Sequence, residues 1–295
     1  MEKMLDEELK KSIQNVMDTY GGFPQDVLEE QLAVVQNVYN NTGQDRFDGL
    51  SPEQMRGLLY GRWGENLITI NPKKFDGNDI PMIKQIKYFL NIVKAANEIK
   101  LTKIGNLPPA VVKDIYAQGF IPDTMIDLGI TKLTKETDVN NIVMTKILCK
   151  ISGLIKIGKN SITLTKRAEK IINSSGLFEY LFDVTCNKYN WAYFDYSENE
   201  EIGQLGYNYT LYLINKYGNK WRDEDFYADL YFKAFDYLKE CDKYFMIEGC
   251  YINRTLNQIM KYYGLIEYEN KKLERGNIRK TELFEKYIKV GMYLA

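Results

Sequence analysis

The stretch GLIKIGKNSITLTKRAEKII, residues 153–172, constrains the fold of this 295-residue chain more than any other part of it. Apolar residues alternate on both sides of a Gly-Lys-Asn-Ser turn, which predicts two short strands in a hairpin. Thr165 follows the second strand and has a side chain suited to cap a helix. The sequence therefore predicts a small hairpin that leads directly into a helix.

The elements before this hairpin predict the module to which it belongs. Residues 80–97, 108–116 and 138–152 have the apolar periodicity of helices, and residues 98–102 are typical of a short extended piece. The resulting order is helix, strand, helix, helix, strand, wing, strand. This is the order of a winged helix, a variant of the helix-turn-helix fold. We expect a mainly α protein whose β-structure is limited to small wings.

Composition divides the chain into three regions. Only five of the 23 tyrosines precede residue 172, so a junction is predicted at residues 172–176, Ile-Asn-Ser-Ser-Gly. Ser51 and Gln54 form the pattern of a capping box around a proline at the first helical position. The predicted regions are a helical N-terminal region (1–80), a winged-helix-like domain (81–174) and an aromatic-rich helical domain (175–295).

The third region contains a weaker copy of the hairpin pattern. Residues 251–263 predict a helix, GLIEYE at 264–269 repeats the Gly-Leu-Ile of the first hairpin, and a turn is expected near Asn270. Thr281 can then cap a last helix. The recurrence predicts a second winged-helix-like unit at the end of the chain.

Charge is concentrated in the middle of the chain. The whole protein has a formal charge of −1, yet residues 81–171 contain 15 basic and seven acidic side chains. A basic module between acidic regions is what a nucleic-acid-binding protein presents to phosphate. The alternative is a solvated lysine surface that has no partner.

The third helix of the module is the expected recognition helix. We expect its packed face to comprise Val143, Ile147, Leu148 and Ile151. Its outward face, which would offer hydrogen-bond donors to base edges, is expected to comprise Asn141, Thr145, Lys146, Cys149 and Lys150. The wing is expected to bind phosphate through Lys156, Lys159, Lys166, Arg167 and the backbone amides near Gly158 and Asn160.

These residues also have a family resemblance. Gly153-Leu154-Ile155, continuing to Leu164-Thr165-Lys166-Arg167, resembles the wing of bacterial winged-helix regulators, although Ala168 stands where those proteins commonly have glycine. Residues 50–240 are similar to a group of uncharacterised bacterial proteins that share LTKIGNLP (101–108), the Gly-Leu-Ile wing and an aromatic stretch such as YNWAYFDY (189–196). The resemblance implies the architecture and no particular reaction.

Several kinds of site are excluded or disfavoured. The chain has no histidine, so it has no Ser-His-Asp or Cys-His nucleophile system and no histidine-containing zinc site. The four cysteines have neither zinc-site nor disulfide-framework spacing, and we interpret them as small buried residues. The acids at 223–225 and Asp229 are typical of a helix start, residues 195–201 lack the glycine of a calcium loop, and Trp191 is expected in the core. We expect no catalytic, cofactor-binding or metal site.

Our leading interpretation is a cytoplasmic, non-enzymatic DNA-binding protein, with a role in regulation, because no signal peptide or membrane span is evident. The rival is a protein–protein interaction module that uses the same folds without binding nucleic acid. An enzyme that relies on carboxylate, lysine, tyrosine or cysteine chemistry ranks third. A homodimer is expected from the way such modules recognise paired half-sites.

Overall fold

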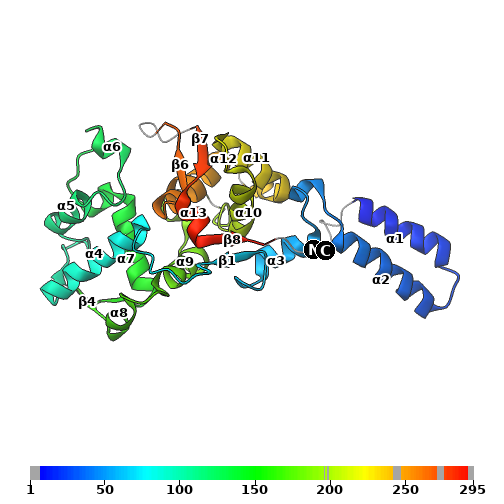
Figure 1. The fold of residues 1–295 in the computed structure, drawn as a ribbon, viewed down its shortest axis with the longest axis horizontal. Coiled ribbons are helices and arrows are strands. Elements are labelled where there is room, and N and C mark those ends of the chain that lie inside the picture. The colour runs from blue at the N-terminus through cyan, green and yellow to red at the C-terminus, as the bar shows by residue number, and fades with distance from the viewer. Residues whose placement is uncertain (1–6, 196, 198, 242–246, 271–275, 292–295) are drawn as a thin grey trace.

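The computed structural model of the protein describes residues 7–195, 197, 199–241, 247–270 and 276–291. Helices dominate, and the strands in this part of the chain form sheets of only two or three strands. The prediction of a mainly α fold with small wings is therefore confirmed. Figure 1 shows an elongated molecule with a helical hairpin at one end and a helical unit with a small sheet at the other.

The helical hairpin is formed by α1 (Glu7–Tyr20) and α2 (Gln25–Asn41). None of the 17 residues of α2 is buried, so this hairpin projects from the molecule (Figure 1). A short 3-10 turn, η2 (Asp45–Phe47), and the helix α3 (Pro52–Tyr60) follow. The side chain of Ser51 accepts from the Gln54 N–H and the Gln54 side chain accepts from the Ser51 N–H, which confirms the predicted capping box.

Residues 81–171 form the first unit. Its elements are α4 (Pro81–Ala96), β2 (Ile99–Lys100), α5 (Pro109–Ala117), α6 (Thr124–Asp127), η3 (Glu136–Asp138), α7 (Asn140–Ile151), β3 (Ile155–Ile157), β4 (Ser161–Leu164) and α8 (Lys166–Ile171). The predicted order of helices and strands is present, and the long connection between α5 and α7 adds α6 and η3. The junction expected at residues 172–176 lies between α8 and the next helix, α9 (Leu177–Asn187).

The small sheet of the first unit has the strand order β2-β4-β3, with both pairs antiparallel. Ile99 and Ile157 both pair with Ile162, and this row turns toward the helices, since Ile99 and Ile162 are buried. Alternation along a strand then places Lys100 and Lys156 on the opposite, outward face.

Residues 207–287 form the second unit. Its elements are α10 (Tyr207–Tyr217), β5 (Arg222–Asp223), α11 (Glu224–Ala234), η5 (Asp236–Cys241), α12 (Ile247–Tyr251), the π-helix η6 (Ile252–Met260), β6 (Ile266–Tyr268), β7 (Asn277–Lys280) and α13 (Glu282–Tyr287). The strand order is β5-β7-β6, the same pattern as in the first unit. The acids at 223–225 lie where β5 passes into the start of α11.

The two units hold their hairpins with the same hydrogen bonds. Thr165 Oγ1 donates to the Gly153 carbonyl at 2.7 Å and accepts from the N–H three residues further on at 3.2 Å. Thr281 Oγ1 donates to the Gly264 carbonyl at 2.6 Å and also accepts from the N–H three residues further on at 3.2 Å. The repeated Gly-Leu-Ile in the sequence therefore corresponds to a structural repeat.

The N-terminal and C-terminal regions share a sheet that the sequence did not predict. β1 (Ile68–Ile70) pairs antiparallel with β8 (Ile288–Val290), so that Ile68 lies opposite Val290 and Ile70 opposite Ile288. The Asn71 N–H also donates to the Tyr287 carbonyl at 2.6 Å. This pairing ties the last described strand to the segment directly before the first unit.

Aromatic side chains fill the core between the two units. The Phe182 ring lies 5.0 Å from Tyr263, and the Phe178 ring lies 4.8 Å from Tyr287. Trp191, in the 3-10 helix η4 (Trp191–Phe194), is 0% exposed and donates through Nε1 to the Thr185 carbonyl at 2.8 Å. The expectation that Trp191 belongs to the core is confirmed.

Candidate nucleic-acid interface

The predicted recognition helix, α7, does not present the face that we expected. Asn141, Thr145 and Cys149 are 2%, 1% and 0% exposed, so the expectation that they point outward is wrong. The reason is that α7 is the central helix of its unit and packs against α4, α5 and α9. On a helix covered from several sides, small polar residues are buried along with apolar ones.

Hydrogen bonds with α4 satisfy the buried polar side of α7. Gln85 Nε2 donates to Thr145 Oγ1 at 2.9 Å and to Asn141 Oδ1 at 3.0 Å. Asn141 Nδ2 in turn donates to the Ile121 carbonyl at 3.2 Å. Buried amide and hydroxyl groups require such partners, and here they join α4 to α7. Asn141 and Thr145 therefore have a structural role.

The expected packed face of α7 is also only partly correct. Val143 and Leu148 are buried and Ile147 is half-buried, but Ile151 is 37% exposed. A helix with apolar residues on more than one side does not reveal from periodicity alone which side faces solvent.

Lys146 is occupied by an ion pair. Its Nζ lies 2.5 Å from Glu136 Oε1, and Glu136 is 1% exposed. Glu136 also accepts from the Leu107 N–H. The ion pair fixes the segment between α5 and α7 to α7. Lys146 therefore does not extend into solvent, contrary to the expectation.

The remaining predicted residues are exposed and surround the hairpin. We call them, with Lys100 of the neighbouring strand, the wing surface: Lys100, Lys150, Lys156, Lys159, Asn160, Lys166 and Arg167. No lysine or arginine of this set forms an ion pair within the part of the chain that the structure describes. Lys100 is a member that sequence reasoning missed, because only the sheet register places it beside Ser161, across β4 from Lys156.

The backbone of the turn contributes less than expected. The Gly158 N–H donates to the Ser161 carbonyl at 2.8 Å, and the Asn160 carbonyl accepts from the Leu101 N–H at 2.8 Å. The Gly158 amide is thus used to close the hairpin.

Arg167 is held in place by an aromatic ring. Its guanidinium carbon lies 4.5 Å from the centroid of Tyr180, which is a favourable cation–π arrangement. Tyr180 Oη donates to the Ser152 carbonyl at 2.6 Å, directly after the end of α7. Tyr180, on α9, therefore anchors one cation of the wing surface, although the residue lies beyond the predicted domain boundary.

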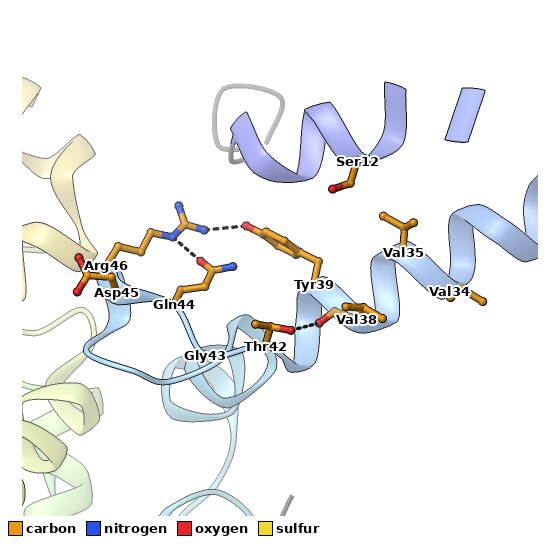
Figure 2. A pocket seen from close by; sticks show the side chains of 10 residues that line it. All are labelled: Ser12, Val34, Val35, Val38, Tyr39, Thr42, Gly43, Gln44, Asp45 and Arg46. Carbon is orange, nitrogen blue, oxygen red and sulfur yellow. Dashed lines mark hydrogen bonds between the residues drawn. The ribbon is translucent and has the colours of Figure 1, made fainter. Parts of the chain in front are cut away.

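An open hollow lies between the N-terminal hairpin and the loop that follows it. Figure 2 shows Val35 of α2 pointing toward α1, where Ser12 lies, and Val34 and Val38 also line the hollow. Arg46 donates to Tyr39 Oη at 3.1 Å and to Gln44 Oε1 at 2.9 Å. Asp45 and Arg46 contribute charged side chains to the lining of the hollow.

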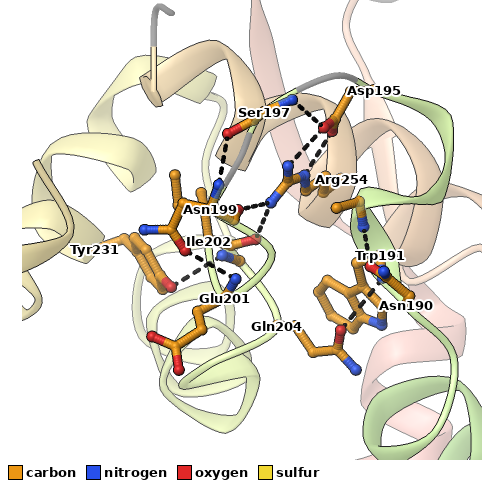
Figure 3. Close-up of polar contacts among 12 residues, drawn as sticks. Asn190, Trp191, Asp195, Ser197, Asn199, Glu201, Ile202, Gln204, Tyr231 and Arg254 are labelled. Carbon is orange, nitrogen blue, oxygen red and sulfur yellow. Dashed lines mark hydrogen bonds and ion pairs between the residues drawn. The ribbon is translucent and has the colours of Figure 1, made fainter. Parts of the chain in front are cut away.

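A buried arginine organises the loop before α10. Arg254, on η6, is 0% exposed and contacts both carboxylate oxygens of Asp195 at 2.6 Å. The same guanidinium donates to the Asn199 carbonyl at 2.7 Å and to the Ile202 carbonyl at 3.3 Å (Figure 3). Asp195, the first residue of the disfavoured calcium loop, thus pairs with an arginine. The cluster holds Asp195, Asn199 and Ile202 against the second unit.

Other candidate reactive groups have structural explanations. Asp223 accepts from the Asp225 N–H at 2.9 Å and so caps α11, as the position of these acids at a helix start suggests. Cys149, Cys186 and Cys250 are buried, which confirms their interpretation as small buried residues, whereas the side chain of Cys241 lies outside the described residues. Burial raises the pKa of the Cys149 and Cys186 thiols, so both remain protonated at neutral pH.

Among the residues that the structure describes, no group of three or more cysteine or acidic side chains is placed to hold a metal ion. Nor does the described part of the chain include a helix with the length and apolar character needed to cross a bilayer. No family model matches the sequence, and no similar curated protein or solved structure was found.

Proposed function

We propose that this chain is a cytoplasmic, non-enzymatic DNA-binding protein, in which both units are winged helices and the wing surface of the first unit contacts backbone phosphates. The observation that carries this proposal is the set of exposed lysine and arginine side chains around one hairpin. Cations that are not neutralised by nearby acids attract a polyanion and release its counterions.

The arrangement supports contact with the backbone more than reading of sequence. Lys100 and Lys156 extend from the same outward face of the sheet, and Lys159 lies at the turn beside them. Phosphate contacts need cations and donors more than a particular shape. Base-edge recognition through α7 is weak in this proposal, because Asn141 and Thr145 are buried.

The salt dependence of binding tests the proposal. Fluorescence anisotropy of a labelled duplex would be measured across a series of salt concentrations, with the wild type and with Lys156→Glu, Lys159→Glu and Lys166→Glu combined. Affinity of the wild type is expected to fall linearly on a log–log plot, and each lost phosphate contact reduces the slope by roughly 0.9.

The matched control reverses three exposed lysines outside the wing surface, Lys188→Glu, Lys220→Glu and Lys289→Glu. It makes the same change in net charge and is expected to retain most of the affinity and the slope. An equal loss of affinity in both triple variants would mean that DNA binding depends only on the net charge of the protein. Absence of wild-type binding at low salt would refute the proposal.

A second candidate is a protein-interaction module, and the tip of the first unit favours it. Met125, Leu128 and Ile130 are 48%, 58% and 64% exposed, and the Ile130 N–H donates to the Met125 carbonyl, so these apolar side chains lie near one another. An apolar interface would respond little to salt. The salt series therefore separates the two candidates.

A further inference from the structure

An open cavity of about 600 Å³ lies where the end of α3 meets α9 and α10. We call it the α9 cavity. The residues that line it include three charged ones, Arg62, Glu179 and Asp183, and three aromatic ones, Trp63, Tyr180 and Tyr207. None of them belongs to the set predicted from the sequence, and Tyr180 also contacts Arg167 of the wing surface.

The aromatic wall of the cavity is held in position by its own contacts. The Trp63 ring stacks on Phe182 with centroids 5.5 Å apart, and Tyr207 lies edge-on to Trp63 at 6.2 Å. Trp63 Nε1 donates to Asn208 Oδ1 at 3.0 Å, and Asn208 Nδ2 donates to the Leu58 carbonyl at 2.8 Å. Burial raises the pKa of Tyr207, so its ring remains a neutral phenol.

The loop that carries Trp63 is also fixed. Asn66 Nδ2 donates to the Gly61 carbonyl at 2.9 Å, and Asn66 Oδ1 accepts from the Ile68 N–H at 2.6 Å. At Gly61 a Cβ atom would lie 2.6 Å from the Gly57 carbonyl oxygen, so only glycine allows this close turn. The cavity is therefore formed before any ligand arrives, which lowers the entropic cost of binding.

Two carboxylates of α9 line the same cavity. Glu179 and Asp183 are four residues apart, a spacing that places them on one face of the helix, where like charges repel. Asp183 accepts from Asn187 Nδ2 at 2.8 Å, but neither acid forms an ion pair with a residue that the structure describes. A cation between them would relieve the repulsion. Arg62 is the one basic residue in the lining, so the charged lining has a net charge of −1.

We propose that the α9 cavity binds a small organic cation, with its ammonium group between Glu179 and Asp183 and against the rings of Trp63 and Tyr207. An indole face attracts a cation through its quadrupole, and nearby carboxylates add charge complementarity. The site has the composition of a small-molecule pocket, namely aromatic walls and a few polar groups.

Isothermal titration calorimetry on the full chain without DNA tests this site. The probes are choline and its uncharged isostere 3,3-dimethylbutan-1-ol, which has the same shape and lacks the positive charge. Choline is expected to give saturable binding and the isostere to bind at least about tenfold more weakly. Because no DNA is present, the outcome is separate from that of the proposed DNA binding.

A pair of isosteric substitutions locates the binding in the cavity. Glu179→Gln with Asp183→Asn removes both charges and is expected to weaken choline binding by about tenfold or more. The control, Asp229→Asn with Glu282→Gln, removes two exposed carboxylates elsewhere and is expected to bind like the wild type. Circular dichroism would verify that both variants are folded. Absence of saturable choline binding, equal binding of the isostere, or unchanged binding by the Glu179/Asp183 variant would overturn the proposal.

Discussion

At the scale of single residues, burial separates the polar side chains that build the protein from those that face a partner. Thr145 and Lys156 were both predicted to contact DNA, yet Thr145 is 1% exposed and Lys156 is exposed. The hydroxyl of Thr145 donates to the Asn141 carbonyl at 2.8 Å and accepts from Gln85. Removing this hydroxyl should therefore lower the stability of the fold and leave the wing surface unchanged.

A pair of substitutions tests this separation. Thr145→Val keeps the shape of the side chain and removes its hydrogen bonds, so the free energy of unfolding is expected to fall by about 1 kcal/mol while DNA affinity is unchanged. Lys156→Ala is expected to change the free energy of unfolding by less than about 0.5 kcal/mol and to weaken DNA binding. Urea denaturation and anisotropy measure the two effects. Weaker DNA binding by folded Thr145→Val would show that α7 does contact DNA.

At the scale of the elements, the two hairpins follow the same local rule in different surroundings. Gly153 and Gly264 precede the first hairpin strand of their units with φ angles of +70° and +67°. A Cβ atom at Gly153 would meet nothing within 4 Å, whereas at Gly264 it would lie 3.0 Å from Pro81 Cδ and from Leu283 Cδ1. The local conformation is shared, but the space around it is not.

Alanine substitution at these glycines should reveal the difference. Gly153→Ala is expected to destabilise the protein by about 1–2 kcal/mol, the cost of a left-handed conformation for a residue with a Cβ atom. Gly264→Ala has the same cost, and its Cβ atom would also crowd Pro81. The decrease in unfolding free energy, measured by urea denaturation, should therefore be larger than for Gly153→Ala. Gly22→Ala, where nothing lies within 4 Å and φ is not positive, is the control. Equal losses at Gly153 and Gly264 would show that Pro81 and Leu283 move aside at little cost.

At the scale of the whole molecule, the end of the chain is attached to the segment that enters the first unit. Besides the pairing of β1 with β8, Asp79 accepts from Lys286 Nζ at 2.7 Å and from the Tyr287 hydroxyl. Burial acts to raise the pKa of Asp79, but the hydrogen bonds from Lys286 and Tyr287 outweigh it and hold the pKa below its usual value.

This attachment should weaken in acid. A carboxyl whose pKa is lowered in the folded state contributes stability above its unfolded pKa, and that contribution is lost as the pH falls through the folded pKa. The difference in unfolding free energy between the wild type and Asp79→Asn is therefore expected to be largest near neutral pH and to shrink below about pH 4. Urea denaturation at several pH values measures it, with exposed Asp229→Asn as the control. A difference that does not change with pH would contradict the role of Asp79.

The sequence by itself determined the main helices of the first unit, the two hairpins and their order, because caps and tight turns depend on residues a few positions apart. Ser51 and Thr165 cap their helices as predicted, and the exposed lysines of the first hairpin were identified because a short polar turn has to face solvent. Only the tertiary structure decided which side of α7 is covered, since that depends on α4, α5 and α9. It likewise decided the β1–β8 pairing and the α9 cavity, whose walls come from segments far apart in the chain and leave no local pattern.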